Sequence, residues 1–254
     1  MRVTILGCGG SGGVPLIGGD WGACDPTEPR NRRTRVSILV EDDQTALVVD
    51  TSPDFRQQML AANVGRLDAV LYTHAHADHV HGIDDLRAIN RLTKAPVPAY
   101  GMQESLDQIR GRFGYIFKPL EPGSTYYRPV VEARAVDGPF TVGTIPVVPF
   151  RQDHGYSTTL GFRFGPLAYS TDVVRLDEAA FAALAGVSVW IVDCFRQEPH
   201  PTHSHLEQTL NWISAVKPRR AILTHMGEQL DYASLRARLP AGVEPGYDGL
   251  VVQV

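Results

Sequence analysis

Residues 73–81 read Thr-His-Ala-His-Ala-Asp-His-Val-His, and this stretch decides the fold and the chemistry. Three histidines and one aspartate fall within the six residues 74–79, in an H-x-H-x-D-H pattern. The apolar run 67–72 before them predicts a buried strand, and the run 83–92 after them predicts a helix. The cluster is therefore expected on a strand-to-helix loop, where a rigid scaffold commonly carries functional residues.

The residue types in this cluster indicate a metal site. Imidazole and carboxylate groups together suit Zn, Mn or Fe. The tight spacing lets one loop serve two ions, with His74 and His76 facing one and Asp78 and His79 facing the other. A lone loop histidine is typical of solvated surface. Four ligand-type side chains beside a buried strand are costly to bury without a partner, and a metal is such a partner.

The composition is that of a soluble globular protein. The chain has 254 residues, of which 43% are hydrophobic and 20% charged, and its formal net charge is −4. That charge alone neither favours nor excludes a nucleic-acid partner. We find no repeat, low-complexity segment or linker, so a single domain over residues 1–254 is predicted.

Cysteine usage and hydropathy predict a cytoplasmic protein. Cys8, Cys24 and Cys194 are sparse and odd in number, which fits a reducing cytoplasm better than a disulfide framework. The chain begins with a short strand pattern that lacks the apolar region of a signal peptide. No run approaches the roughly 18 apolar residues of a membrane helix.

Hydrophobic periodicity predicts an α/β protein. Strands are predicted at 3–6, 36–40, 45–50, 67–72, 96–100, 130–136, 141–150, 158–164, 167–170, 187–193, 220–224 and 250–254. Further helices are predicted at 55–62, 101–112, 176–184, 206–216 and 232–239, and 114–127 is expected to be irregular. This order fits two packed sheets with helices outside. The glycine-rich stretch 7–13 is interpreted as a tight turn, with a phosphate-binding loop as the alternative.

The remaining histidines extend the metal hypothesis. All nine histidines fall in four short segments, around 74–81, 154, 200–205 and 225. His154 and His225 each follow a predicted strand, and Asp172 ends another, where a carboxylate can bridge two cations. The alternatives are a hydrogen-bonded loop histidine for His154 and His225, and a cap or turn residue for Asp172.

The H-x-H-x-D-H motif after a strand resembles the signature of the metallo-β-lactamase superfamily, and His74, His76, Asp78 and His79 match it in full. The resemblance implies an α/β four-layer αβ/βα sandwich with the site at one edge between the sheets. It also implies a ligand set in which one ion is held by His74, His76 and His154, the other by Asp78, His79 and His225, with Asp172 between them. Two divalent ions (Zn or Mn) about 3.5–4 Å apart activate water and stabilise the attacking and leaving oxygens.

Further segments favour one branch of that superfamily. Residues 7–15, 24–35, 50–54, 82–87, 200–203, 224–226, 230–232 and 247–249 resemble phosphodiesterases related to the phosphoribosyl 1,2-cyclic phosphate phosphodiesterase of the carbon–phosphorus lyase pathway. The resemblance implies a phosphodiesterase that hydrolyses a small cyclic phosphodiester, such as phosphoribosyl cyclic phosphate or a cyclic nucleotide. That group also has a structural zinc site. Here only Cys24 remains of its three thiolates and Glu228 replaces its histidine, so no structural zinc is predicted.

Several catalytic and substrate residues are predicted more weakly. His203 is the expected general acid, because the His-Pro-Thr-His segment resembles that branch; His205 and then His200 are its rivals, and Asp78 joins the catalytic set. Arg32 and Arg33 are predicted to bind phosphate through their guanidinium forks, with His205 nearby. A solvated or salt-bridged strand edge is the alternative for the arginines. The run 112–117 is either a wall for a base or sugar, or a core or homodimer contact.

Two other functions are weighed against the phosphodiesterase. A tRNA 3′-processing nuclease usually carries a long arm, and no Gly/Lys-rich insertion of that kind is visible in this slightly acidic chain. A non-catalytic metal- or ligand-binding member of the superfamily would not need the intact ligand set. A thioesterase or lactamase has no support beyond the loop of residues 74–79, which we call the metal loop. The expected partner is therefore a small-molecule phosphodiester, without a membrane or nucleic acid.

Overall fold

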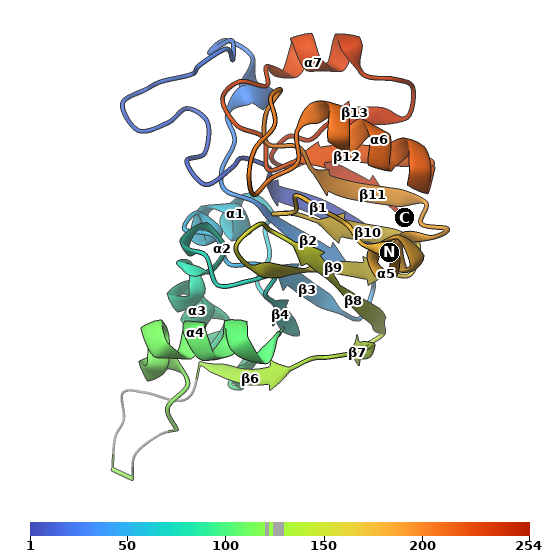
Figure 1. The fold of residues 1–254 in the computed structure, drawn as a ribbon. Coiled ribbons are helices and arrows are strands. Elements are labelled where there is room, and N and C mark those ends of the chain that lie inside the picture. Colours follow the sequence, from blue (N-terminus) through green and yellow to red (C-terminus); the bar gives the residue numbers. More distant parts are fainter. Residues whose placement is uncertain (120–121, 124–129) are drawn as a thin grey trace.

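Two seven-stranded sheets pack face to face, with helices on their outer sides (Figure 1). The computed structural model describes residues 1–119, 122–123 and 130–254. The first sheet has the order β14 (Val251–Gln253), β1 (Arg2–Gly7), β2 (Ser37–Glu41), β3 (Ala46–Val49), β4 (Ala69–Leu71), β5 (Val97–Gly101) and β6 (Val131–Ala135). The second has the order β13 (Val243–Pro245), β12 (Arg220–Thr224), β11 (Val189–Asp193), β10 (Leu167–Ser170), β9 (Thr158–Phe164), β8 (Ile145–Asp153) and β7 (Phe140–Val142). This is the predicted α/β four-layer sandwich.

The inner strands β2, β3 and β4 of the first sheet are apolar on both faces, because both faces are covered. In β2, Ile38 and Val40 join the core between the sheets, whereas Leu39 belongs to the core beneath the helices. Val48 and Val70 repeat the outward position of Leu39 in β3 and β4. Successive side chains of each strand therefore lie in different cores. A continuous apolar run in the sequence indicates a strand that is buried on both faces.

The helices form the two outer layers. Beside the first sheet lie α1 (Phe55–Ala61), α2 (Ala77–Val80), α3 (Leu86–Thr93) and α4 (Gln103–Phe113), with the 3₁₀ turns η2 (Ile83–Asp85) and η3 (Gly114–Ile116). The other layer contains α5 (Glu178–Leu184), α6 (Leu206–Val216) and α7 (Tyr232–Arg238), and η1 (Pro29–Asn31) lies in the long loop after β1. Among the described residues, no helix combines the length and the apolar character that a bilayer crossing requires.

The structure differs from the predicted elements in a few places. The predicted strand 141–150 is two strands, β7 and β8, because Gly143 takes a positive φ of 53° in a turn between them. The short strand β13 was not predicted. The metal loop contains a single helical turn, α2, which includes Asp78 and His79. Of the stretch expected to be irregular, Gly114–Ile116 is η3, and residues 120–121 and 124–127 lie outside the described residues.

The glycine-rich stretch after β1 forms the predicted tight turn. The Gly13 N–H donates to the Gly10 carbonyl at 2.9 Å, and Gly13 has a φ of 66°. Gly10 also lies against Phe195, whose ring would be 2.9 Å from a Cβ at that position. The turn therefore needs glycine for its backbone angle at one residue and for close packing at another.

Candidate metal centre

The polar residues gather at one edge of the second sheet. Strands β8, β10, β11 and β12 run in the same direction, so their carboxyl ends meet there. His154 follows β8, Asp172 follows β10, Asp193 ends β11 and His225 follows β12. The loop 74–79 reaches the same place from the carboxyl end of β4. Ligands of open α/β sheets typically bind outside the carboxyl ends of strands.

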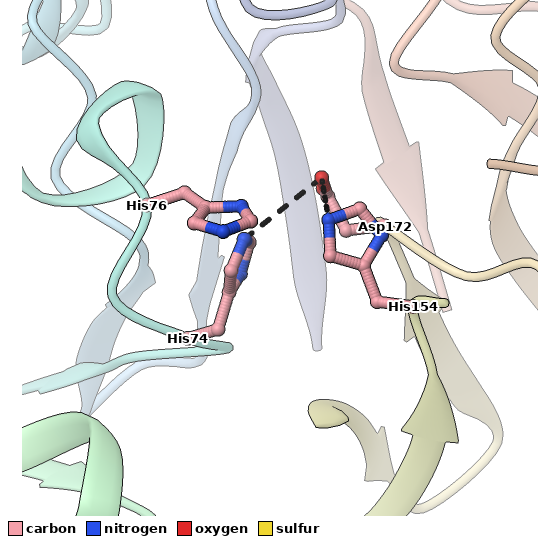
Figure 2. A group of neighbouring side chains, drawn as sticks. All are labelled: His74, His76, His154 and Asp172. Atoms are coloured by element: carbon pink, nitrogen blue, oxygen red, sulfur yellow. Dashed lines mark ion pairs between the residues drawn. The ribbon is translucent and has the colours of Figure 1, made fainter. Parts of the chain in front are cut away.

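The seven predicted ligands converge in two groups. In each group, one ligand atom per residue lies within 4.8 Å of the others: the first group is His74, His76, His154 and Asp172, and the second is Asp78, His79 and His225. In Figure 2, His74 and His76 from the metal loop face His154 and Asp172 from the second sheet. Such clusters of imidazole and carboxylate donors bind divalent metal ions. We call these seven residues the ligand cluster.

The carboxylate of Asp172 lies between the two groups. Its Oδ1 is 4.0 Å from His74 Nε2 and 3.7 Å from His154 Nε2. Its Oδ2 is 3.1 Å from His79 Nε2 and 3.5 Å from His225 Nε2. Each oxygen thus faces one group, as the predicted bridging position requires.

Unpaired nitrogens show that the cluster fits a cation. The Nε2 atoms of His74, His79 and His225 are buried and have no hydrogen-bond partner among the described residues. A buried polar atom without a partner costs about 1–3 kcal/mol. These three atoms belong to the two groups of converging donors, so a divalent ion would satisfy several of them at once.

Two buried aspartates lie behind the ligand histidines, and one of them is within hydrogen-bond distance of its histidine. Asp50 accepts hydrogen bonds from the Thr73 N–H at 2.9 Å and the Thr73 hydroxyl at 2.8 Å, and its Oδ2 lies 2.7 Å from His79 Nδ1. Asp193 Oδ1 lies 3.8 Å from His225 Nδ1. A carboxylate on the far ring nitrogen orients a metal-ligating histidine and raises its basicity.

Sequence reasoning missed both aspartates. The sequence places Asp50 at the end of the predicted strand 45–50 and Asp193 at the end of the predicted strand 187–193, and neither is among the predicted site residues. Each follows or ends a buried strand at its carboxyl end, β3 for Asp50 and β11 for Asp193. That position was the signal that would have identified them, because a carboxylate there is costly to bury without a partner.

His203 lies against the second ligand group. Its ring stacks on that of His225 at 4.6 Å, with 16° between the planes, and its Nδ1 is 3.3 Å from Asp193 Oδ2. It also forms a third group of possible ligands with Asp172 and His225. The loop that carries it is tied to the first group, because the Thr202 carbonyl lies 2.7 Å from His154 Nδ1.

The other two candidates for the acid lie differently. The His200 Nδ1 accepts from the Thr202 N–H at 3.3 Å, and its ring is 5.1 Å from that of His203. His205 lines a separate surface pocket with Glu198 and Leu210. His205 is not among the described groups of possible metal ligands, and the weak prediction that it binds substrate stays a prediction.

The pKa values of His74 and His79 shift in opposite directions. Desolvation lowers the pKa of His74, and the neighbouring charge of His79 acts in the same sense. Desolvation also opposes the charged form of His79, but Asp172, Asp78 and Asp50 outweigh it and raise its pKa. Metal binding requires the deprotonated ligand nitrogen, so it would compete with the proton at His79.

Two ligands have strained backbones. Asp172 has a φ of 55° and His225 a φ of 56°, both in the left-handed region. Asp50, behind His79, has a φ of 64°. Aspartate and histidine enter this region more readily than most residues, and such strain clusters at functional sites.

The prediction that Arg33 binds substrate is wrong. Its side chain is buried, with 2% of the residue exposed, and its Nη1 donates to the Gly227 carbonyl at 3.1 Å. Its Nη2 donates to the Leu230 carbonyl at 2.5 Å and to Asn31 Oδ1 at 3.2 Å. Asn31 Nδ2 in turn donates to Asp231 at 2.6 Å. We call Arg33, Asn31, Asp231 and the two carbonyls the Arg33 network; it anchors the loop after His225.

The neighbouring loop contains Cys24 and Trp21. Cys24 Sγ lies 4.0 Å from Arg33 Nη1, and Arg32 lies over the Trp21 ring at 5.1 Å. The Arg33 guanidinium therefore occupies the neighbourhood of the one remaining thiolate position. The absence of a structural zinc, and a role for Arg32 in substrate binding, stay predictions.

The sequence of this chain is similar to those of several known proteins. The β-lactamase superfamily domain matches residues 45–226. An octanoyltransferase of Porphyromonas gingivalis is 34% identical over 253 residues, covering 98% of this chain and 51% of that protein, so the chain spans about half of its length. The anti-Pycsar protein Apyc1 of Paenibacillus harenae is 29% identical over 223 residues, covering 82% of this chain and 90% of that protein.

Several solved structures have a similar fold. A diphosphatase from the PhnP family is 33% identical, with a TM-score of 0.91 over 100% of this chain and 97% of that one. Human short-form tRNase Z has a TM-score of 0.69 at 18% identity, covering 100% of this chain and 99% of that one, and it shows the fold alone. The chain therefore belongs to the metallo-β-lactamase superfamily and has its metal-binding hydrolase fold.

Proposed function

We propose that the protein is a dinuclear metal-dependent phosphodiesterase that hydrolyses a small, cyclic phosphodiester such as phosphoribosyl cyclic phosphate or a cyclic nucleotide. The observation that carries the proposal is Asp172, whose two oxygens face separate groups of ligands. A single-ion site has no need of the second group. The likeness to a PhnP-family diphosphatase supports attack of water on phosphorus as the reaction class.

In this proposal some residues of the chain position the ligand histidines and others transfer protons. Two divalent ions, when bound, would supply an activated water and positive charge for the attacking and leaving oxygens. Asp50, whose Oδ2 lies 2.7 Å from His79 Nδ1, holds the His79 ring in place, and Asp193 lies beside the His225 ring. Asp78, whose Oδ2 is 3.4 Å from His79 Nε2, borders the same space and would accept a proton from the attacking water.

His203 would act as the general acid. As the bond from phosphorus to the leaving oxygen breaks, the oxygen takes a proton from the His203 ring. Asp193, whose Oδ2 lies 3.3 Å from His203 Nδ1, would keep the ring oriented. The stacking on His225 places the ring next to the second ligand group.

Metal loading and phosphoester hydrolysis test the proposal directly. The protein, loaded with Zn or Mn, should hold about two ions per chain and hydrolyse a 2′,3′-cyclic nucleotide and bis(p-nitrophenyl) phosphate. Chelation should abolish turnover and re-addition of metal should restore it. No turnover at full loading with either metal would contradict the proposal, and less than about one ion per chain would favour a ligand-binding module.

A variant pair tests the general acid. His203→Asn should lower kcat by about 10²-fold at unchanged metal content, because a positioned proton donor contributes about that much. His205→Asn is the matched control and should keep full activity, because His205 lines a different pocket. A loss of metal in His203→Asn would instead make His203 a ligand of the third group.

The tRNA 3′-processing nuclease remains the alternative, since tRNase Z has the same fold. Salt-sensitive binding of precursor tRNA in the nanomolar range would favour it over a small-molecule substrate. We also propose a cytoplasmic location, because all three cysteines are free and buried, as is typical of reducing compartments.

A further inference from the structure

We infer that Thr171 is a positioning residue of the metal centre: its hydroxyl fixes the carboxylate of Asp172, so that each oxygen faces one ligand group. The inference rests on the proposed function, because it concerns how the centre of that function is assembled. Neither Thr171 nor the two side chains that act with it, Gln152 and Thr159, has a part in the proposed mechanism.

The Thr171 hydroxyl contacts the carboxylate directly. It donates to Asp172 Oδ2 at 2.6 Å, and Thr171 is fully buried. Oδ2 is the oxygen that faces His79 and His225. A carboxylate oxygen has two lone pairs, so Oδ2 can accept this hydrogen bond and still face a cation. The hydroxyl therefore restrains the carboxylate without taking it from the second ligand group.

The carboxylate of Asp172 needs a restraint of this kind. The terminal torsion of an aspartate side chain is broad, so its own rotamer preference does not decide where the two oxygens point. In the structure Oδ1 lies 3.7 Å from His154 Nε2 in the first group, and Oδ2 lies 3.1 Å from His79 Nε2 in the second. Rotation about that torsion would move both oxygens away from these positions at once.

A second set of contacts holds the backbone of the same two residues. The Thr159 hydroxyl, from β9, donates to the Asp172 carbonyl at 3.0 Å. Gln152 Nε2, from β8, donates to the Thr171 carbonyl and to Thr159 Oγ1, both at 3.1 Å. Both side chains are buried. They stabilise the segment in which Asp172 takes its positive φ of 55°, a conformation that costs energy unless its surroundings hold it.

Packing alone does not require a threonine at position 171. Valine has nearly the same shape, and a buried hydroxyl adds a polar atom that must be paired. Here the acceptor is a carboxylate, and 2.6 Å lies in the short range of charge-assisted hydrogen bonds. Partners that orient a ligand in this way typically contribute about 10–100-fold to metal affinity. The hydroxyl is therefore explained by the metal centre rather than by the core.

Variants of Thr171 provide the test, with metal binding as the readout. Thr171→Val and Thr171→Ala remove the hydroxyl, and Thr171→Ser keeps it. In competition with a chelator of known affinity for Zn, the valine and alanine variants should bind metal about 10–100-fold more weakly, and the serine variant within about threefold of wild type. The visible absorption spectrum of the Co²⁺-loaded protein should change in the first two variants and keep its wild-type form in the third.

Thr45→Val is the matched control. Thr45 is buried, and its hydroxyl lies 2.9 Å from Thr144 Oγ1. It precedes β3 at the amino end of that strand, whereas the ligand cluster lies at the carboxyl ends of strands. Its replacement should lower stability in denaturant unfolding but leave the metal affinity and the Co²⁺ spectrum unchanged. The control separates the loss of a buried hydroxyl from the loss of this particular hydrogen bond.

The possible outcomes distinguish this inference from the proposed function, because metal binding is measured without turnover. If the wild type hydrolyses no phosphoester but the predicted losses are seen, the proposed function fails and the inference stands. Unchanged metal affinity and spectrum in Thr171→Ala would overturn the inference. An equal loss in Thr171→Ser would also overturn it, because the methyl group and not the hydroxyl would then be responsible. Alanine and serine differ by the hydroxyl alone, so this pair decides the question if Thr171→Val does not fold.

Discussion

The ligand cluster and the Arg33 network are both largely buried, polar and assembled from distant segments, but they differ in how many of their polar atoms make hydrogen bonds. In the Arg33 network both terminal guanidinium nitrogens donate to oxygens, and of the Arg33 nitrogens Nε alone has no hydrogen-bond partner among the described residues. In the ligand cluster the Nε2 atoms of His74, His79 and His225 have no hydrogen-bond partner among the described residues. Because a buried polar group is normally paired, the comparison separates a site organised for a ligand from one organised for the fold.

The strongest test of this difference is Asp172→Asn. Asparagine tolerates the φ of 55°, so the change removes the charge between the two groups with little backbone cost. We expect loss of metal and a fall in kcat/KM of about 10³-fold, equivalent to ~4 kcal/mol of transition-state stabilisation. Metal analysis and steady-state kinetics measure both. Asp153→Asn, at an exposed ion pair with Arg175, is the control and should stay near wild type. Full metal content and activity in Asp172→Asn would contradict the assignment of the ligand cluster as a metal site.

A smaller effect is expected behind the ligands, at Asp50→Asn. The φ of 64° again suits asparagine, but an amide cannot replace both carboxylate contacts to Thr73 and His79. Metal affinity should fall about 10–100-fold, as for other supporting carboxylates. Competition with a chelator of known affinity measures this change. Asp43→Asn, in an exposed turn, serves as the control. An unchanged affinity would mean that the orientation of His79 is set by packing alone.

For the Arg33 network the comparison predicts a loss of stability without a loss of metal. Arg33→Met leaves the Gly227 and Leu230 carbonyls without their donor, which should lower the free energy of unfolding by about 2 kcal/mol. Denaturant unfolding measures this, and Arg32→Met should change it by less than about 0.5 kcal/mol, as is usual at exposed positions. A variant of Arg33 that keeps its stability but loses metal would place the network within the metal site.

The smallest expected effect is a pH dependence from Asp231 in the same network. Desolvation alone would raise its pKa, but hydrogen bonds from the Ser234 N–H and Asn31 hold it at about 2. A lowered folded-state pKa adds stability above the unfolded value near 4, and this stability is lost as the pH falls towards 2.

Because Asp231 is only partly buried, solvent screens the interaction and the contribution should be on the order of 1 kcal/mol or less. Unfolding of the wild type and Asp231→Asn at pH 7 and pH 3 measures it. Their difference in stability should shrink at the lower pH, and a difference that grows there would contradict the assignment.

Much of the fold could be predicted because its signals are local. Apolar runs such as those of β4 and β11 identify strands that are covered on both faces, and the segment 74–79 follows one of them. The split between β7 and β8 was missed, because a single glycine turn inside an apolar alternation changes little in the periodicity. The role of Arg33 was wrong for a related reason: a run of arginines does not reveal which member is buried.

The sequence by itself determined which donors are available and that each follows a buried strand, because residue type and short-range periodicity are properties of neighbouring residues. Only the tertiary structure decided which oxygen of Asp172 faces which histidines, that Asp50 and Asp193 stand behind His79 and His225, and that Arg112 rather than Arg33 reaches the metal loop. These relations join segments far apart in the chain. They depend on how two twisted sheets align their strand ends, which no local pattern encodes.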